Sequence, residues 1–492
     1  MSRSQQTVFE RNVPARAVVD HAMGGTRHAV FWQDDLGEHA TYPALSAPVR
    51  ADLVVVGGGY TGLWSALRAR QRHPGARVVL VEGRSVGWAA SGRNGGLCGA
   101  RLAPGDEDGR GRPPDDNAIL QRLGHENLAA IGSTVDDLGL DCQWEPTGVV
   151  DLAIEPHQID WLLDAAARAT RTGAPHAFLD RAKVRDEIAS PIYEAGLVRP
   201  DDAALVHPAR LATELARAAS ELGVEIFEQT RVTGLTPPGR GTHDVAVLHT
   251  TSPAGEATVL ADRVLLATSA FPSLLRRFRR HTVPVYDYVI ATEPLSTGLL
   301  GAIGWRGRQG LADLANRSHY YRLTADDRIV FGGHDAVYHY GGRMSRTYED
   351  RPGAYRRLTE HLLTTFPQLE GIRLTHRWSG AVDTSTRSGV CFGQAAGGRV
   401  QHAAGSAGRG VAGSHFAAQV MLDRLDALDG APATERTALR TVRRTPVPFP
   451  PEPVAAAGIR ATQRALDRAD HRYGRRGTLL RSLDALGLGL DY

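Results

Sequence analysis

The 492-residue chain is poor in lysine and in cysteine. Lys183 is its single lysine, so nearly all of the 57 basic residues are arginine. The three cysteines, Cys98, Cys142 and Cys391, are widely spaced and form neither a disulfide framework nor a zinc-binding pattern. We therefore expect a reduced compartment and predict no metal site.

Long apolar runs and charge of one dominant sign are also missing. No stretch approaches the roughly 20 apolar residues that a membrane-spanning helix needs, and residues 1–25 lack the apolar core of a secretory signal. The net charge of +3 is spread along the chain, which leaves no electrostatic footprint for nucleic acid. These absences predict a cytoplasmic protein that neither spans a membrane nor binds nucleic acid.

The strongest motif follows a short apolar run in the first fifth of the chain. Residues 52–56 are valine-rich, as in a strand buried in a parallel sheet, and lead into Gly57, Gly59 and Gly62 in a G-x-G-x-x-G pattern, after which helical spacing covers 60–71. The first glycine allows a tight turn, the second lets backbone approach a pyrophosphate, and the third lets the helix pack closely on the strand. The start of the helix offers free N–H groups and partial positive charge to phosphates.

An acidic residue completes this motif. A second apolar strand at 76–81 ends in Glu82, twenty residues after Gly62, where a carboxylate can accept hydrogen bonds from ribose hydroxyls. The alternative is an ordinary glycine-rich turn, because the chain contains 54 glycines. The combination of strand, glycines, helix, strand and acid favours a dinucleotide site over that alternative.

The chain leaves this nucleotide-binding pattern and later returns to it. Residues 103–116, rich in proline, glycine and aspartate, predict an exposed loop. An amphipathic helix at 205–223 and apolar strands at 224–227 and 261–270 resume the pattern. The interruption predicts an inserted second domain, and substrates commonly bind where two domains meet.

Periodicity predicts the remaining elements. The predicted helices are 117–138, 156–173 with Trp161 and Leu162 on its apolar face, 352–366, and 414–428 preceded by Gly405, Gly408, Gly410 and Gly413. The predicted strands are 148–154 and 282–293, with a hairpin over 320–334 that turns at 325–327. Residues 1–50 predict an arm with aromatic anchors, and a proline-rich linker at 446–453 precedes one or two helices.

Four segments resemble a known family. SGRNGG at 91–96, ATSA at 267–270, AGSAGRG at 404–410 and YYRLTADDRIVFGG at 320–333 resemble the glycine oxidase and D-amino-acid oxidase-like family of FAD-dependent oxidoreductases. The likeness extends from about 31 to 428 and is strongest for the branch of gamma-glutamylputrescine oxidoreductase-like amine oxidases.

The resemblance implies an α/β fold with two domains. A glutathione-reductase-like FAD-binding domain would comprise 51–105, 200–281 and 391–430, and an inserted substrate domain built on a mostly antiparallel sheet would comprise 106–199 and 282–390. The N-terminal arm at 1–50 and a C-terminal linker and helical tail at 431–492 would flank them.

The resemblance also implies which residues hold FAD. They are Gly57, Gly59, Tyr60, Thr61, Gly62, Glu82, Gly83, Arg84, Ser91, Gly92, Arg93, Asn94, Gly95, Gly96, Leu97, Val232, Thr268, Ser269, Gly408, Arg409, Gly410 and Val411. Residues 91–95 would line the pyrophosphate and the flavin ring, and 408–410 would approach the flavin N1 and C2 carbonyl edge. Positive charge from Arg409 and a helix start there would stabilise reduced flavin. The alternative is a second G-x-G-x-x-G for NAD(P)H.

Family members that oxidise amino acids or sarcosine carry clamps that this chain lacks. The arginine that often holds an amino-acid carboxylate is replaced by Val382, and the lysine of sarcosine oxidases by Val411 and Ala412. An arginine fork binds a carboxylate through two charge-assisted hydrogen bonds, so its loss favours an amine, or an amine with a distal polar or anionic group, over a plain α-amino acid. No cysteine or histidine occupies the family's covalent flavin positions, so we expect noncovalent FAD.

The implied chemistry is hydride transfer from the carbon that bears an amine to flavin N5, followed by hydrolysis of the imine. Tyr321, Arg322 and His334 are the candidates for substrate contact, although tyrosines in a sheet are commonly core residues. The electron acceptor is oxygen or another molecule. An amino-acid dehydrogenase that uses a quinone or protein acceptor, a non-catalytic flavoprotein subunit and an NAD(P)H-dependent monooxygenase stay open.

Overall fold

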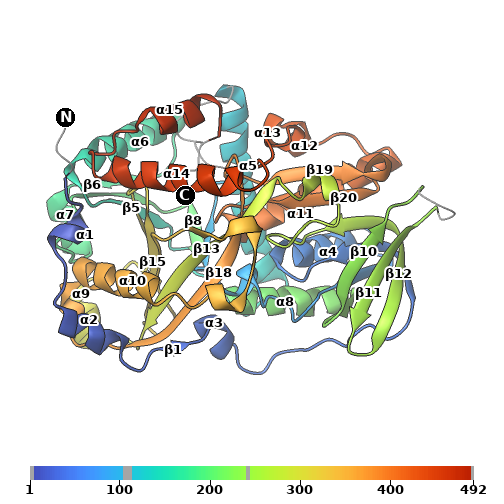
Figure 1. The fold of residues 1–492 in the computed structure, drawn as a ribbon, viewed down its shortest axis with the longest axis horizontal. Coiled ribbons are helices and arrows are strands. Elements are labelled where there is room, and N and C mark those ends of the chain that lie inside the picture. Colours follow the sequence, from blue (N-terminus) through green and yellow to red (C-terminus); the bar gives the residue numbers. More distant parts are fainter. Residues whose placement is uncertain (1–4, 103–113, 240–243, 489–492) are drawn as a thin grey trace.

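In the computed structural model, which describes residues 5–102, 114–239 and 244–488, two large sheets lie side by side along the long axis. Figure 1 shows β10, β11 and β12 at one end of that axis, and α2, α9 and α10 at the other. Sequence-distant segments build each sheet, so the chain crosses between them repeatedly.

The first sheet has the order β10-β11-β12-β2-β3-β9, with β20 beside β12 and β19 beside β20. Its strands are β2 (Val49–Val56), β3 (Val78–Val81), β9 (Glu225–Phe227), β10 (Arg231–Thr236), β11 (Ala246–Ser252), β12 (Gly255–Leu266), β19 (Cys391–Ala395) and β20 (Val400–Ala404). The β2 strand is parallel to β3 and β12, and its residues Val54 and Val55 are fully buried. Valine suits such a strand because its branched side chain packs well on both faces of a covered sheet.

Helices α4 (Tyr60–Arg72), α8 (Pro208–Glu221) and α11 (Gly410–Asp426) pack together on one face of this sheet. Trp64 and Leu67 of α4 are fully buried between them. Helix α5 (Pro114–Asp137) packs against α11, and a short ribbon of β4 (Leu97–Gly99) and β8 (Ala203–Leu205) lies nearby. The apolar faces predicted from periodicity therefore form one core.

The second sheet has the order β1-β18-β13-β16-β15-β14-β5-β7-β6, with β17 beside β13. Its strands are β1 (Arg27–His28), β5 (Val149–Ala153), β6 (Ala177–Leu179), β7 (Ala195–Arg199), β13 (Thr282–Thr292), β14 (Gly310–Asp313), β15 (His319–Leu323), β16 (Ile329–Gly333), β17 (Val337–Tyr338) and β18 (Leu374–Ser385). Most neighbours are antiparallel, and the parallel pairs are β1 with β18 and β5 with β14.

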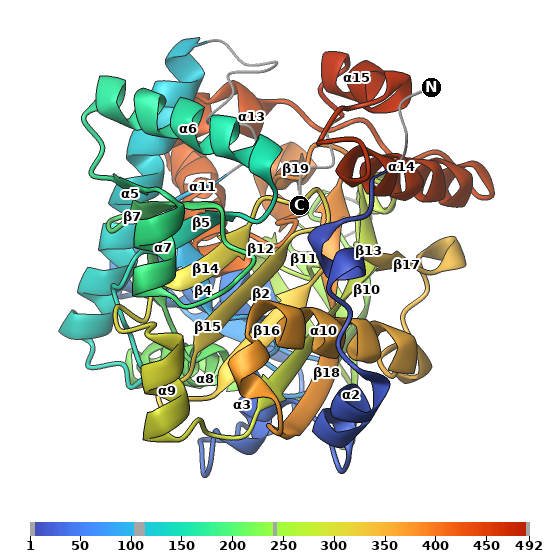
Figure 2. The ribbon, with the colours of Figure 1, turned by 90° about the vertical axis from the view of Figure 1, so that its left-hand side faces the viewer.

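The two faces of this second sheet differ. Helix α10 (Pro352–Thr365) covers the outer face, where Tyr288 and Tyr321 join its core. Figure 2 shows α10 in front of β16 and β18, with β2 of the first sheet behind them. Because successive strand residues point to opposite faces, Asp287 and Tyr320 lie on the face toward the first sheet.

Both chain ends pack against the second sheet. The N-terminal arm contains α1 (Val8–Arg11), α2 (Arg16–Met23), β1 and α3 (Phe31–Asp34), and buries Phe31 and Trp32. The tail contains α14 (Val454–Asp470) and α15 (Thr478–Ala485), and Ile459 of α14 packs on Val283 and Val285 of β13.

The remaining helices are α6 (Ile159–Thr172), α7 (Arg181–Glu187), α9 (Thr297–Ile303), α12 (Glu435–Ala438) and α13 (Arg440–Arg443). Within the described residues, none of the helices combines the length and the apolar character that crossing a membrane requires.

Three local predictions differ from the structure. Trp161 of α6 is 39% exposed, whereas Leu162 is buried as expected. Helix α11 begins at Gly410 rather than at 414, because the left-handed φ angles end at Gly408 and helical backbone follows. Of the predicted loop at 103–116, residues 103–113 lie outside the described residues, and 114–116 open α5.

Candidate active site

The turn from β2 into α4 accepts only glycine at two positions. Gly57 has a φ of +114°, and a Cβ there would lie 2.5 Å from the carbonyl oxygen of Ala267 on the neighbouring strand end. A Cβ on Gly62 would lie 1.8 Å from the carbonyl oxygen of Gly57. Strand and helix therefore meet backbone to backbone, which is the close packing expected from the sequence.

The start of α4 is prepared for an anion. Its N-cap, Gly59, provides no side-chain cap, and the N–H of Tyr60 donates to Ser91 Oγ at 2.9 Å. A Cβ on Gly59 would lie 3.0 Å from the same oxygen, so the space over the helix start is narrow and lined by polar groups. The free N–H groups of the first turn and the helix dipole favour phosphate oxygens at this place.

Glu82 lies at the carboxyl end of β3 and is 9% exposed. Its Oε2 accepts from the N–H of Gly58 at 2.7 Å, and its Oε1 accepts from the N–H of Arg84 and from Trp88 Nε1 at 2.8 and 2.9 Å. Burial raises the pKa of this carboxyl group, and the hydrogen bonds act in the opposite direction. The bonds fix the carboxylate beside the glycine turn, where it can receive ribose hydroxyls.

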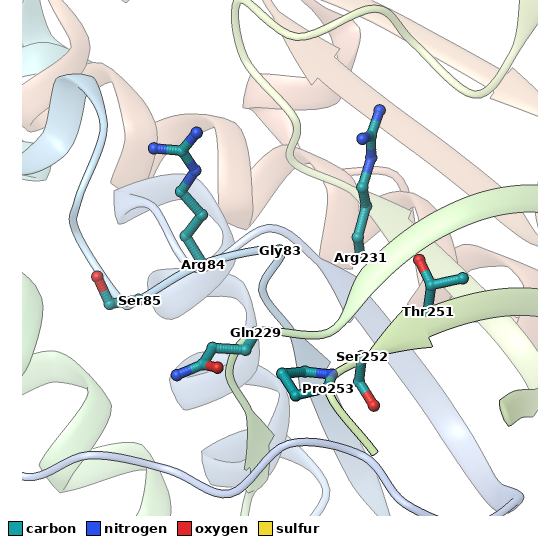
Figure 3. A pocket seen from close by; sticks show the side chains of 8 residues that line it. All are labelled: Gly83, Arg84, Ser85, Gln229, Arg231, Thr251, Ser252 and Pro253. Carbon is teal, nitrogen blue, oxygen red and sulfur yellow. The ribbon is translucent and has the colours of Figure 1, made fainter. Parts of the chain in front are cut away.

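A pocket of about 520 Å³ opens next to Glu82. It is lined by Gly83, Arg84, Ser85, Gln229, Arg231, Thr251, Ser252 and Pro253. Figure 3 shows the side chains of Arg84 and Arg231 pointing the same way on either side of Gly83. The pocket therefore lies between the end of β3 and β10, beside Glu82, where it could take the adenosine half of a dinucleotide.

The segment at 91–96 links the two sheets. Arg93 pairs with Glu349 at 2.9 Å and donates to the carbonyl oxygens of Trp88 and Ser379 at 2.8 and 3.2 Å. Asn94 Oδ1 accepts from the N–H of Gly96 at 2.8 Å, which closes a tight turn within the segment at 91–96.

Two buried tryptophans hold the backbone of this segment. Trp32 of the arm donates to the carbonyl oxygen of Asn94, and Trp378 of β18 donates to that of Arg93, each at 2.8 Å. The sequence indicated aromatic anchors in the arm but not their target, because the partners are 62 and 285 residues away.

The turns at 268–269 and 405–410 follow β12 and β20, which run parallel to β2, so they lie at the same edge of the sheet as the turn at 57–62. Thr268 Oγ1 is buried and has no hydrogen-bond partner among the described residues, and Ser269 has a φ of +47°. Asp383 accepts from Ser406 Oγ and from the N–H of Gly405, both at 2.6 Å, and burial raises its pKa. Asp383, which the sequence analysis missed, therefore shapes the loop that precedes α11.

Arg409 is the N-cap residue of α11, and its Nη1 donates to the carbonyl oxygen of Ser388 at 3.4 Å. Val411 is buried, whereas Gly408 has a φ of +87° and is exposed. Within the described residues no strand follows α11. A second dinucleotide motif for NAD(P)H would need such a strand with a terminal acid, so the elements around Arg409 do not match that alternative.

Tyr320 lies on the face of the second sheet that points toward the segment at 91–96. Its hydroxyl donates to Asp287 Oδ2 at 2.5 Å. The Tyr320 side chain fits closely against two glycines. A Cβ on Gly95 would lie 2.4 Å from its Cε2, and a Cβ on Gly332 would lie 2.6 Å from its hydroxyl oxygen. Burial raises the pKa of Asp287 to about 6, and burial beside this carboxylate holds the pKa of Tyr320 well above its usual range. Neither residue was predicted, since no spacing links positions 287 and 320.

The model of the DAO family, described as FAD dependent oxidoreductase, matches residues 52–424. The chain belongs to this family. FAD is therefore its cofactor, and the predictions of the family, of the FAD-binding α/β fold and of an oxidoreductase are confirmed.

Relatives of similar length support this assignment. The gamma-glutamylputrescine oxidoreductase of Escherichia coli (strain K12) is 29% identical over 434 residues, which are 85% of this chain and 95% of that protein. The probable oxidoreductase OrdL of Haemophilus influenzae is 28% identical over 403 residues, 80% of this chain and 87% of that protein. Glycine oxidase from Geobacillus kaustophilus has the same fold, with a TM-score of 0.63, 20% identity, and coverage of 79% of this chain and 99% of that one.

The residues around the glycine turn fit FAD. The unpartnered Thr268 hydroxyl, the start of α4, whose N-cap Gly59 has no side chain, and the tight space over Gly59 suit a pyrophosphate, and the pocket beside Glu82 suits an adenosine.

The structure does not bring the three predicted substrate residues of this DAO-family protein together. Tyr321 points to the outer face, is 1% exposed and shares a hydrogen bond of 2.7 Å with the hydroxyl of Tyr193. Arg322 points to the inner face, but it is fully buried and its Nη1 donates to the carbonyl oxygen of Val206 at 2.7 Å. Burial lowers the pKa of this guanidinium to about 10. His334 lies beside two other histidines behind the sheet.

Proposed function

We propose that this DAO-family protein oxidises the C–N bond of an amine without a neighbouring carboxylate, and that the substrate nitrogen binds at Asp287 and Tyr320. The observation that carries this proposal is the Asp287–Tyr320 pair, which lies half-buried against Gly95 in the segment at 91–96. A carboxylate at such a place attracts an ammonium group, because the low local dielectric strengthens the attraction.

The arginines near this pair are held largely by other groups. Arg322 donates from Nε and Nη1 to backbone carbonyl oxygens, and its Nη2, which has no hydrogen-bond partner among the described residues, lies 3.8 Å from Glu145 Oε1. Arg93 binds Glu349 and two carbonyl oxygens. Val382 is apolar, so it offers a substrate carboxylate no hydrogen bond. These features support an amine substrate over an α-amino acid, as does the likeness to a gamma-glutamylputrescine oxidoreductase.

Asp287 would act on the proton of the substrate nitrogen. With a pKa of about 6, its carboxylate is ionised at pH 7, so it can hold the ammonium form and then accept one proton from it. The neutral amine then has the lone pair that the developing C=N bond requires. FAD, when bound, supplies the acceptor for the two electrons and the hydrogen of the C–H bond.

Tyr320 positions this carboxylate. Its hydroxyl donates to Oδ2, and backbone N–H groups of Tyr288 and Gly333 also bond to the carboxyl group, so the carboxylate is held in place from several sides. The buried tryptophans Trp32 and Trp378 hold the backbone of the opposite wall, the segment at 91–96, in place. Water would hydrolyse the released imine to a carbonyl compound.

The test is an anaerobic visible spectrum of the FAD-loaded protein with monoamines, diamines, N-acylated diamines and amino acids added in turn. We expect an amine to bleach the flavin band and Asp287→Asn to slow bleaching by about 10²-fold or more at unchanged FAD content. Bleaching by α-amino acids alone, or an Asp287→Asn protein as fast as wild type, would overturn the proposal. Peroxide formation after admission of air identifies an oxidase, and its absence identifies a dehydrogenase with a quinone or protein acceptor.

A further inference from the structure

Behind the second sheet, three histidines from separate elements converge. His319 belongs to β15, His334 follows β16, and His361 belongs to α10. One ring nitrogen from each lies within 4.8 Å of the others, and among the described residues they are the group that can hold a metal ion. This cluster lies on the opposite face of the sheet from Asp287 and Tyr320, because His319 and Tyr320 are successive strand residues that point to opposite faces.

A carboxylate orients the first histidine. His319 Nδ1 lies 2.7 Å from Asp313 Oδ2, so this nitrogen carries the proton and directs the lone pair of Nε2 inward. His319 Nε2 in turn lies 2.8 Å from His361 Nδ1, which must then carry the proton that joins the two rings. A carboxylate that fixes a ligating histidine is the usual outer partner of metal sites.

Burial, with the neighbouring histidines and arginines, holds the pKa values of His334 and His361 well below their usual range. His334 also has a φ of +62°, a conformation that is uncommon outside glycine and recurs at functional sites.

The charged groups around the cluster are balanced. Arg317 and Arg357 face it, and both pair with the buried carboxylate of Asp335. Arg317 also pairs with Asp467 of the tail helix α14 at 3.0 Å. Phe9 of the arm stacks on His361 with ring centroids 4.1 Å apart, which closes the cluster from the other side.

We propose that His319, His334 and His361 bind one divalent zinc-type ion that ties β15, the loop after β16 and α10 together. Three neutral imidazoles and one water are a typical ligand set for Zn²⁺, with Zn–N distances of about 2.0–2.1 Å. The proton on His361 moves from Nδ1 to Nε2 as the metal takes its place between the two rings, so binding releases no net proton.

The experiment uses the full, tag-free chain loaded with FAD, stripped with a chelator and then titrated with Zn²⁺ in competition with a chromophoric chelator. We expect one equivalent to bind with a Kd below 1 μM, Co²⁺ to give a tetrahedral absorption band, and the Tm to rise with Zn²⁺.

Two variants test the assignment. His334→Asn removes a ligand but tolerates a positive φ, and we expect it to lose the cobalt band. Asp313→Asn keeps all three ligands, and we expect zinc affinity to fall 10–100-fold. His39→Asn, at an exposed histidine far from the cluster in sequence, serves as the control and should bind like wild type. An absence of stoichiometric binding, or equal binding by His334→Asn and the control, would show that the cluster is only a hydrogen-bonded core.

Discussion

Tyr320 and Tyr321 are neighbours in β15 with opposite environments. The Tyr320 hydroxyl meets a half-buried carboxylate on the face toward the segment at 91–96, whereas the Tyr321 hydroxyl meets Tyr193 in an aromatic core. One step along a strand therefore separates a polar surface from a packed interior.

The same contrast extends across the whole sheet. The inner face carries Asp287 and the tryptophans that hold the segment at 91–96, and the outer face carries a continuous aromatic and aliphatic core against α10. Four experiments can test whether the reaction takes place on the inner face, and they follow from the largest expected effect to the smallest.

The largest effect concerns the cofactor itself. Gly59→Val would fill the narrow space between the start of α4 and Ser91, so we expect a folded protein that is purified without FAD. The flavin absorbance per polypeptide measures the result. Gly75→Val is the matched control, because no atom lies within 4 Å of the added Cβ. Full flavin occupancy in Gly59→Val would contradict the proposal that FAD binds at the start of α4.

The next effect concerns the inner-face carboxylate. Asp287→Asn should lower kcat/KM for an amine by about 10²-fold or more, because the amide cannot take a proton from the substrate nitrogen. Steady-state kinetics with the amine found in the anaerobic screen would measure it. Unchanged kcat/KM would move the chemistry away from this face.

The pH dependence follows from the raised pKa of Asp287. The ionised carboxylate is the active form, so kcat/KM should fall about tenfold per pH unit below a pKa of about 6 and level off above it. The inflection should vanish in Asp287→Asn. A profile that is flat between pH 5 and 7 in the wild type would argue against a role for this carboxylate.

The smallest effects come from the two tyrosines. Tyr320→Phe should lower kcat/KM by roughly tenfold, since it loses one hydrogen bond to a charged group, and should raise the inflection pH. Tyr321→Phe should leave kinetics unchanged and lower the free energy of unfolding by about 1 kcal/mol, because it removes the buried hydrogen bond to Tyr193. Equal changes of kcat/KM in the two variants would show that the two faces of the sheet do not differ in their contribution to the reaction.

The sequence predicted the parts of the fold that depend on neighbouring residues. The glycine turn, α4 and Glu82 are local, and the hairpin predicted at 320–334 corresponds to β15 and β16. Its orientation was not predictable, because alternation divides HYYRL into two sets of side chains without telling which set faces the cofactor. Tyr321 was therefore chosen where Tyr320 has the polar partner.

Residues that act through distant partners were also missed. Asp287 becomes significant through Tyr320, Asp383 through Gly405, and the histidine cluster spans 42 residues between His319 and His361. Only the packing of separate strands brings these groups together, and a single sequence contains no periodicity that records such packing.

The tryptophan contacts to the segment at 91–96 have a consequence for biosynthesis. A ribosome delivers β2, α4 and β3 early, and this unit can form its own hydrogen bonds as soon as it emerges. The carbonyl oxygen of Arg93, in contrast, waits for Trp378, which is made 285 residues later. The turn at 57–62 and Glu82 are thus in place long before the contact that anchors Arg93, which can form only after most of the chain has been synthesised.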